Sequence, residues 1–112
     1  MALDESHFHR LADATLKGLM QAIDDLGSDA IDVDLASGIL TLTLADGGTY
    51  VLNKQAPNRQ IWLSSPRSGA WHFDHRGGVG AAAWAATRGG GTLAELLSSE
   101  LGAVLGGRLD LG

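Results

Sequence analysis

The stretch IDVDLASGILTLTLADGGTYVLN (residues 31–53) decides the fold, because apolar and polar side chains alternate along it. Alternation of period two is typical of β-strands that bury one face and expose the other to water. Ala36-Ser37-Gly38 and Asp46-Gly47-Gly48 interrupt the pattern with residue types that favour tight turns. We therefore predict antiparallel strands over residues 31–35, 40–44 and 49–53.

The segment before this stretch has a helical period. Its apolar residues recur every three or four positions from Phe8 to Leu26, which places them on one side of an α-helix. Asp4 or Ser6 is suited to cap the start of this helix, and Gly27 is suited to end it. A long amphipathic helix therefore precedes the strands.

The segment after the stretch continues with short strands and ends in a second helix. Alternation predicts strands over residues 60–64 and 70–74, and a short sixth strand around residues 83–86. Thr92 and Glu95 match a capping box, and the leucine-rich stripe that follows them has a helical period. The predicted fold is α+β: a two-layer sandwich with two helices packed on one face of a five- to six-stranded antiparallel sheet.

Composition limits the possible classes of function. With 112 residues and 45% hydrophobic content, the chain is expected to form one domain over residues 1–112. It has no cysteine, which excludes disulfides, thiolate metal sites and thiol catalysis. No uncharged run is long enough to cross a bilayer, and Met1 is followed by Asp4 and Glu5 instead of a basic segment, so we expect a cytoplasmic protein without membrane contact.

Negative charge is concentrated in the first third of the chain. Residues 1–34 carry eight acidic and two basic side chains, whereas residues 35–112 carry five acidic and six basic ones. This distribution argues against nucleic acids and anionic membranes as partners. It favours cations or a basic protein surface.

Strand alternation predicts which side chains lie on the uncovered face of the sheet. If Ile61 and Leu63 point toward the helices, Gln60 and Trp62 point away from them. The same argument places these residues outward: Asp32, Asp34, Thr41, Thr43, Asn53, Ser64, His72 and Asp74. Trp62 then has two interpretations, as an incidental exposed residue or, with its polar neighbours, as a protein-binding anchor.

Five carboxylates are predicted to lie where the first helix ends and the first strand begins: Asp24, Asp25, Asp29, Asp32 and Asp34. Hard cations prefer oxygen ligands, so these side chains are candidate metal ligands, with a solvated acidic face as the alternative. His9 and Asp13, one turn apart on the predicted helix, are further candidates. For His9 the alternative is a surface histidine without a function.

Three segments together resemble the frataxin family. They are NKQAPNRQIWLS (residues 53–64), GAWHFD (residues 69–74) and FHRLAD (residues 8–13), the last being similar to the bacterial branch, CyaY. The resemblance covers roughly residues 6–76 and is most specific in N-x-Q-x-P-x-x-Q-x-W. The chain departs from bacterial relatives at Met20 and Gln21, where they often have glutamates, and in its glycine-rich residues 76–91.

The resemblance implies a regulatory protein of iron–sulfur cluster assembly that binds Fe²⁺ or Fe³⁺ weakly and uses no organic cofactor. It implies an acidic ridge (Asp24, Asp25, Asp29, Asp32 and Asp34) and a contact set on the open sheet face (Asn53, Gln55, Gln60 and Trp62). The implied partners are a cysteine desulfurase and a scaffold protein, and the chain is expected to be a monomer or an iron-driven oligomer. The alternatives are an acidic interaction module whose metal binding is incidental, and a weak ferroxidase or iron-storage activity in a protein that is otherwise not an enzyme.

Overall fold

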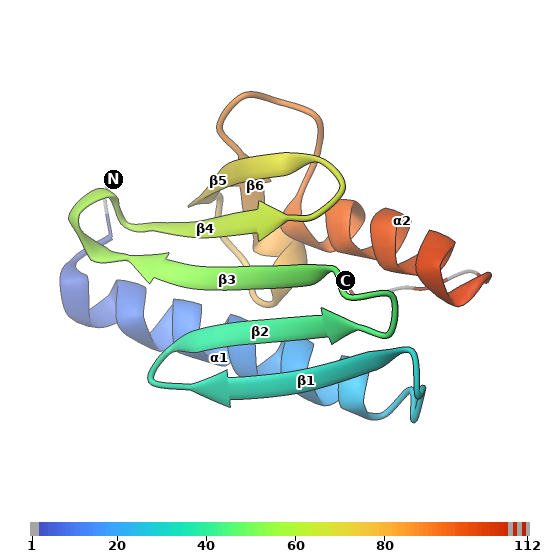
Figure 1. Cartoon of the computed structure of the whole chain (residues 1–112). Coiled ribbons are helices and arrows are strands. Elements are labelled where there is room, and N and C mark those ends of the chain that lie inside the picture. Colours follow the sequence, from blue (N-terminus) through green and yellow to red (C-terminus); the bar gives the residue numbers. More distant parts are fainter. Residues whose placement is uncertain (1–2, 108, 110, 112) are drawn as a thin grey trace.

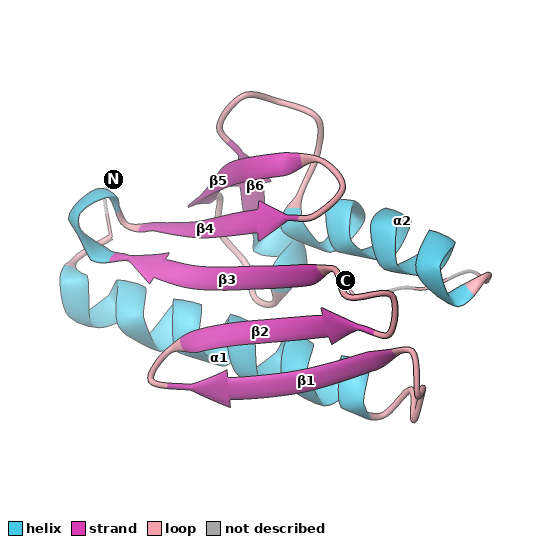
Figure 2. Cartoon of the chain, viewed as in Figure 1, coloured by secondary structure: helices cyan, strands magenta, loops and turns pink. Residues whose placement is uncertain are grey.

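Two helices lie on one face of a six-stranded antiparallel sheet, in a computed structural model that describes residues 3–107, 109 and 111 (Figures 1 and 2). Residues 1, 2, 108, 110 and 112 of the predicted domain lie outside the described residues. The elements are α1 (Glu5–Asp24), β1 (Ile31–Ala36), β2 (Ile39–Leu44), β3 (Thr49–Gln55), β4 (Gln60–Ser65), β5 (Gly69–His75), β6 (Trp84–Ala86) and α2 (Leu93–Leu105). Short 3₁₀ turns, η1 (Ala56–Asn58) and η2 (Ala81–Ala83), precede β4 and β6. The strands lie in chain order from β1 to β6, which confirms the predicted fold class.

Helix α1 begins and ends at charged caps. The Asp4 carboxylate accepts a hydrogen bond from the backbone N–H of His7 at 2.7 Å, so Asp4 is the N-cap. Asp25 caps the other end, and Gly27 follows in the left-handed conformation (φ 60°), which glycine adopts without steric cost. The predicted apolar stripe is buried against the sheet: Phe8, Ala12, Leu16, Leu19 and Ile23.

The strand register keeps the predicted alternation of faces. A two-residue turn at Ser37 and Gly38, both with positive φ, pairs Ala36 with Ile39 and fixes the β1–β2 hairpin. Along β2, Leu40, Leu42 and Leu44 are buried toward the helices, while Thr43 is exposed on the other face. The uncovered face of the sheet is therefore the one that the sequence predicted.

Trp84 of β6 lies at the centre of the core. Its side chain is 0% exposed, and its indole Nε1 donates to Thr15 Oγ1 of α1 at 2.9 Å. Its ring meets that of Phe8 edge to face, with 6.1 Å between centroids. The short strand β6, which pairs with β5 over three residues, thereby anchors the glycine-rich segment to both layers.

A polar network ties α2 to the turn between β4 and β5. The Glu100 carboxylate of α2 accepts hydrogen bonds from Ser65 Oγ at 2.6 Å, from Tyr50 Oη at 2.9 Å and from Ser68 Oγ. The predicted capping box starts this helix, with Thr92 and Glu95 each accepting from the other's backbone N–H. The half-buried carboxylate of Glu100 is therefore held by three hydroxyl groups, unlike the acidic residues near β1.

Candidate functional site: an open sheet face and an acidic ridge

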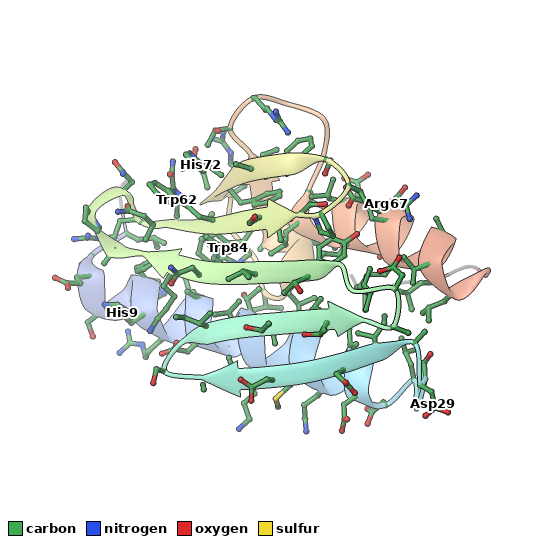
Figure 3. The ribbon with its side chains drawn as sticks, in the orientation of Figure 1. His9, Asp29, Trp62, Arg67, His72 and Trp84 are labelled. Carbon is green, nitrogen blue, oxygen red and sulfur yellow. The ribbon has the colours of Figure 1, made fainter. Side chains whose placement is uncertain are left out.

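Trp62 forms a stacked pair with His72 on the open face of the sheet (Figure 3). The two residues are directly opposite each other in the β4–β5 register, their ring centroids are 4.1 Å apart, and the rings are tilted by only 10°. Trp62 is half-buried and His72 is exposed. Strand alternation predicted that both face outward, and the structure adds that their rings stack face to face on the open side of the sheet.

Hydrogen bonds fix the orientation of this indole. Trp62 Nε1 donates to Gln60 Oε1 at 2.8 Å, and Gln60 Nε2 donates in turn to Asp74 Oδ1 at 3.0 Å. A side chain that is already held in one rotamer loses less entropy when a partner binds. The chain from Trp62 through Gln60 to Asp74 therefore preorganises the open face for contact.

A shallow hollow of about 230 Å³ lies beside the stacked pair. Its outward-facing lining includes Val51 and Asn53 of β3, together with Ala70 of β5. Asn53 is exposed and is directly opposite Trp62 in the β3–β4 register. An aromatic surface next to a small hollow with polar groups suits the insertion of a partner side chain.

Gln55 holds the local backbone at one end of this face. Its Oε1 accepts from the backbone N–H of Asn58 at 2.9 Å and from Asn58 Nδ2 at 3.0 Å, so it caps the η1 turn. Within the contact set, Asn53 presents a polar group to solvent and Trp62 an apolar one. Gln55 and Gln60 also position other residues, Asn58 and Trp62 respectively.

The acidic ridge follows the corner between α1 and β1. Asp24 and Asp25 end the helix, and Asp29 lies in the loop after it (Figure 3). Asp32 and Asp34 point from β1 to the open face. All five side chains are exposed, and no described residue forms a salt bridge with any of them. The predicted clustering is met only in part, because the carboxylates form a band around the free side of β1.

His9 and Asp13 lie on the N-terminal half of α1, away from this band. His9 Nε2 is 3.7 Å from Glu5 Oε1, and Asp13 Oδ1 is 2.8 Å from Lys54 Nζ of β3. At 1.5 Å of rise per residue, Asp13 is about 16 Å along the helix axis from Asp24. The candidate metal ligands therefore divide into two separate places.

Neither place holds a ready-made metal cage. Among residues 3–107, 109 and 111, no three histidine, aspartate or glutamate side chains converge closely enough to bind one ion. Such single exposed carboxylates can hold a hard cation only loosely, with water completing its coordination. Whether these residues bind iron stays a prediction.

The acidic ridge and the contact set lie apart, although Asp32 and Asp34 share the open face of the sheet with the contact set, because β1 is the edge strand. Three strand spacings between β1 and β4 correspond to about 14 Å.

No helix in the described part of the chain has the length and apolar content needed to span a membrane.

Comparison with known proteins identifies the class. The profile of the family described as "Frataxin-like domain" matches residues 1–107, and the chain belongs to this family. It is 38% identical over 110 residues to the "Iron-sulfur cluster assembly protein CyaY" of Tolumonas auensis, covering 98% of this chain and 100% of that protein. It is also 45% identical to the mitochondrial frataxin homolog of Schizosaccharomyces pombe and 44% identical to the mitochondrial frataxin of Arabidopsis thaliana. These matches cover 88% and 97% of this chain but only 64% and 59% of those proteins, so the chain spans about three fifths of the mitochondrial relatives' length.

Solved structures agree with the fold. A frataxin of the CyaY family from Psychromonas ingrahamii superimposes with a TM-score of 0.84 over 98% of this chain and 99% of that one, at 24% identity. The trimeric frataxin of Saccharomyces cerevisiae, solved in complex with ferrous iron, gives a TM-score of 0.75 at 37% identity over 95% of this chain and 89% of that one.

Two features of the site could not be read from single segments. The ion pair between Lys54 and Asp13 joins β3 to α1, and only the three-dimensional register brings the two residues together. The Gln60–Asp74 hydrogen bond follows from the β4–β5 register, in which these residues are directly opposite. Strand alternation predicts that both side chains face outward, but their contact can be predicted only once the register of the two strands is known.

Proposed function

We propose that this chain regulates iron–sulfur cluster assembly by contacting a cysteine desulfurase and a scaffold protein. The contact set Asn53, Gln55, Gln60 and Trp62 docks one protein surface, and the acidic ridge docks a basic one and binds iron weakly. The full-length match to a protein named for iron–sulfur cluster assembly supports this role. Location in the cytoplasm, expected from the sequence, remains a prediction.

The observation that carries the proposal is the Trp62–His72 stack on an uncovered sheet. Trp62 is oriented by Gln60 and is only half-buried. It does not belong to the hydrophobic core, so core packing does not explain its position. Oriented aromatic side chains with a polar handle are the residues that most often dominate protein interfaces. The same face therefore suits protein contact better than catalysis, and we propose no enzymatic role.

Iron is treated as cargo in this proposal. The exposed carboxylates of the acidic ridge lack a convergent set of three ligands, so binding should be weak, multi-site and unselective among hard cations. The ferrous complex of the yeast relative supports iron as the physiological ion. The protein is a monomer in this proposal, with iron-driven oligomers as the state to test under iron load.

Titration with ferrous iron tests the metal part of the proposal. Changing Asp24→Asn, Asp25→Asn and Asp29→Asn together should abolish most of the binding. A control, Glu5→Gln, removes an exposed carboxylate at the other end of α1 and should retain most of it. A single tight site that survives the triple change would refute the proposed ridge.

Titration with the desulfurase tests the protein part. Exposed charges are screened beyond a Debye length of about 8 Å at physiological ionic strength, so affinity should fall steeply as salt is raised. The triple variant should bind more weakly and show a shallower salt dependence. Affinity that does not change with salt would count against ridge-driven docking.

A second function rests on one specific observation. Since no three acidic or histidine side chains converge in the described residues, the acidic ridge could act only as a docking surface for a basic partner, with incidental metal binding. The two titrations separate these functions, because in this case the desulfurase affinity would be independent of iron.

A further inference from the structure

Strand β1 leaves one side of the sheet unpaired. It is the first strand in the sheet order, and its only strand neighbour among the described residues is β2 (Figure 1). The backbone N–H of Ala45 donates to the Ala30 carbonyl at 2.9 Å, which sets the phase of the hydrogen-bond ladder. In an antiparallel pair the bonded positions alternate, so Asp32 and Asp34 bond to β2. The N–H and C=O groups of Ile31, Val33 and Leu35 therefore point to the free edge.

Apolar side chains accompany this edge on its helix-facing side. Val33 and Leu35 are only half-buried, although both pack against the core. Met20 of α1 is half-buried in the same layer, and Leu26 after the helix is 41% exposed. An added strand would therefore cover apolar surface as well as backbone groups.

The acidic side chains on and near β1 determine which kind of segment can pair with this free edge. Asp32 and Asp34 alternate with the free backbone positions on the open face, and Asp24 and Asp29 lie at the nearby corner. A second copy of this chain pairing through its own β1 would bring carboxylates next to carboxylates, and like charges on neighbouring strands destabilise a sheet. A segment with basic side chains on the open-face side instead gains an opposite charge at each of these positions.

We infer that the free edge of β1 accepts an extended basic segment of a partner protein as a seventh strand. The segment alternates lysine or arginine, facing Asp32 and Asp34, with apolar residues that cover Val33 and Leu35. Pairing with three outward-facing residues would form about six backbone hydrogen bonds in an antiparallel arrangement. The inference rests on the proposed docking role of the acidic ridge, and it specifies how the backbone takes part.

Amide hydrogen exchange with a synthetic peptide tests this pairing. The probe is a peptide of alternating lysine and valine, and the control is the same peptide with glutamate in place of lysine. On addition of the lysine peptide, the amides of Ile31, Val33 and Leu35 should become protected, whereas those of Asp32 and Asp34 should change little because they already bond to β2. Equal binding of the glutamate peptide, or protection without this alternation, would overturn the inference.

Two substitutions of one residue separate backbone pairing from charge attraction. Val33→Pro removes an outward N–H that β2 does not use, so the sheet should survive, as proline is tolerated on edge strands. It should weaken peptide binding on the order of tenfold or more, since β-strand addition depends on main-chain hydrogen bonds. Val33→Ala retains the N–H and should lose much less.

The outcomes also separate this inference from the proposed function. If Val33→Pro binds the peptide as well as Val33→Ala does, strand addition is refuted, while desulfurase binding can still stand. If Val33→Pro does not fold, as shown by its thermal melt, the alternation of protection in the unchanged protein decides the question. Loss of desulfurase binding to the triple acidic variant, measured separately, concerns only the proposed function.

Discussion

Trp84 and Trp62 show how one residue type serves two regions of the molecule. Trp84 lies between sheet and helices, is fully buried, and has its indole N–H bonded to Thr15. Trp62 lies on the uncovered face, stacks on His72, and has its indole N–H bonded to Gln60 on the same strand. The first tryptophan joins elements that are far apart in the chain, whereas the second is oriented by its neighbours toward solvent. The comparison assigns stability to the helix side of the sheet, whereas recognition on the open side is the role that we propose.

Replacing Trp84 should produce the largest effect on stability. Trp84→Ala removes a fully buried indole and is expected to cost about 3–5 kcal/mol of unfolding free energy. Trp84→Phe keeps an aromatic ring beside Phe8 but loses the bond to Thr15, and should cost less. Urea unfolding of both variants measures this, and a Trp84→Ala midpoint equal to that of the unchanged protein would invalidate the comparison.

Trp71 is an intermediate case. Strand alternation places it on the helix side, where the sequence predicts a destabilising substitution, but it is only half-buried. The Arg88 guanidinium lies 3.5 Å above its ring, and its indole N–H donates to Ser68 Oγ at 2.9 Å. Trp84 is therefore the better core control.

Removing the Glu100 carboxylate should have the next largest effect. Burial alone raises the pKa of Glu100, but hydrogen bonds from the Ser65, Ser68 and Tyr50 hydroxyls, with the nearby Arg67 guanidinium, lower the pKa overall from 4.5. Glu100→Gln should cost about 1–3 kcal/mol at neutral pH, because hydroxyl donors lose their charged acceptor. Since the folded-state pKa is the lower one, this advantage is present above the unfolded pKa and is lost as pH falls through the folded one. Melts of both proteins should therefore converge below about pH 4.5, and a difference independent of pH would contradict the assignment.

Tyr50 reports on the same network at high pH. Burial and the hydrogen bond to Glu100 raise the pKa of this phenol from 10.0 to about 12. Because the raised pKa belongs to the folded state, the stabilisation is present below pH 10 and is lost as pH rises through about 12. Tyr50 is the only tyrosine in the chain, so its ultraviolet absorbance gives an unambiguous titration. Ionisation near pH 10 in the folded protein would show that the network is absent.

The triple change of Asp24, Asp25 and Asp29 to asparagine should affect stability little. Asp24 and Asp25 lie at the C-terminal end of α1, where negative charge opposes the helix dipole by about 0.3–1 kcal/mol per group. The variant should therefore melt at the same temperature or slightly higher while iron binding falls. A large loss of stability would mean that the acidic ridge has a structural role.

Local patterns were sufficient to predict most of the fold. Alternation of Leu40, Leu42 and Leu44 predicted a strand and its buried face, because an antiparallel sheet covered on one face exposes the other face to solvent. The Thr92 cap was predicted from residue type and spacing, whereas the sequence left Asp4 and Ser6 as alternatives for the first helix and the structure selects Asp4. The strand around Trp84 was also predicted, but not the central position of its side chain in the core, because the surrounding glycines have no periodicity to indicate depth.

Long-range polar contacts could not be predicted from the sequence. The sequence did not single out Glu100, because its contacts with Tyr50 and Ser65 span 50 and 35 residues. For the acidic ridge, the sequence predicted the residues but not their distribution. Asp32 and Asp34 lie on the open face of β1, whereas Asp24 lies at the helix end, so no three of the predicted ligands converge in the described residues.

Trp62→Ala should have a small effect on stability and a large effect on binding. The substituted indole is half-buried and its main contacts are His72 and Gln60, so we expect a cost of about 1 kcal/mol or less. Val79, which is 86% exposed in the loop before η2, offers a matched control as Val79→Ala.

The central claim, that the open face is built for a partner, is tested most directly by one paired measurement on Trp62→Ala. Its melting temperature and its affinity for the desulfurase–scaffold complex are measured beside those of the unchanged protein and Val79→Ala. The account predicts a nearly unchanged melting temperature with an affinity that falls on the order of tenfold or more, since oriented aromatic residues dominate interface energies. A Trp62→Ala protein that unfolds, or that binds the complex as tightly as Val79→Ala does, would contradict it.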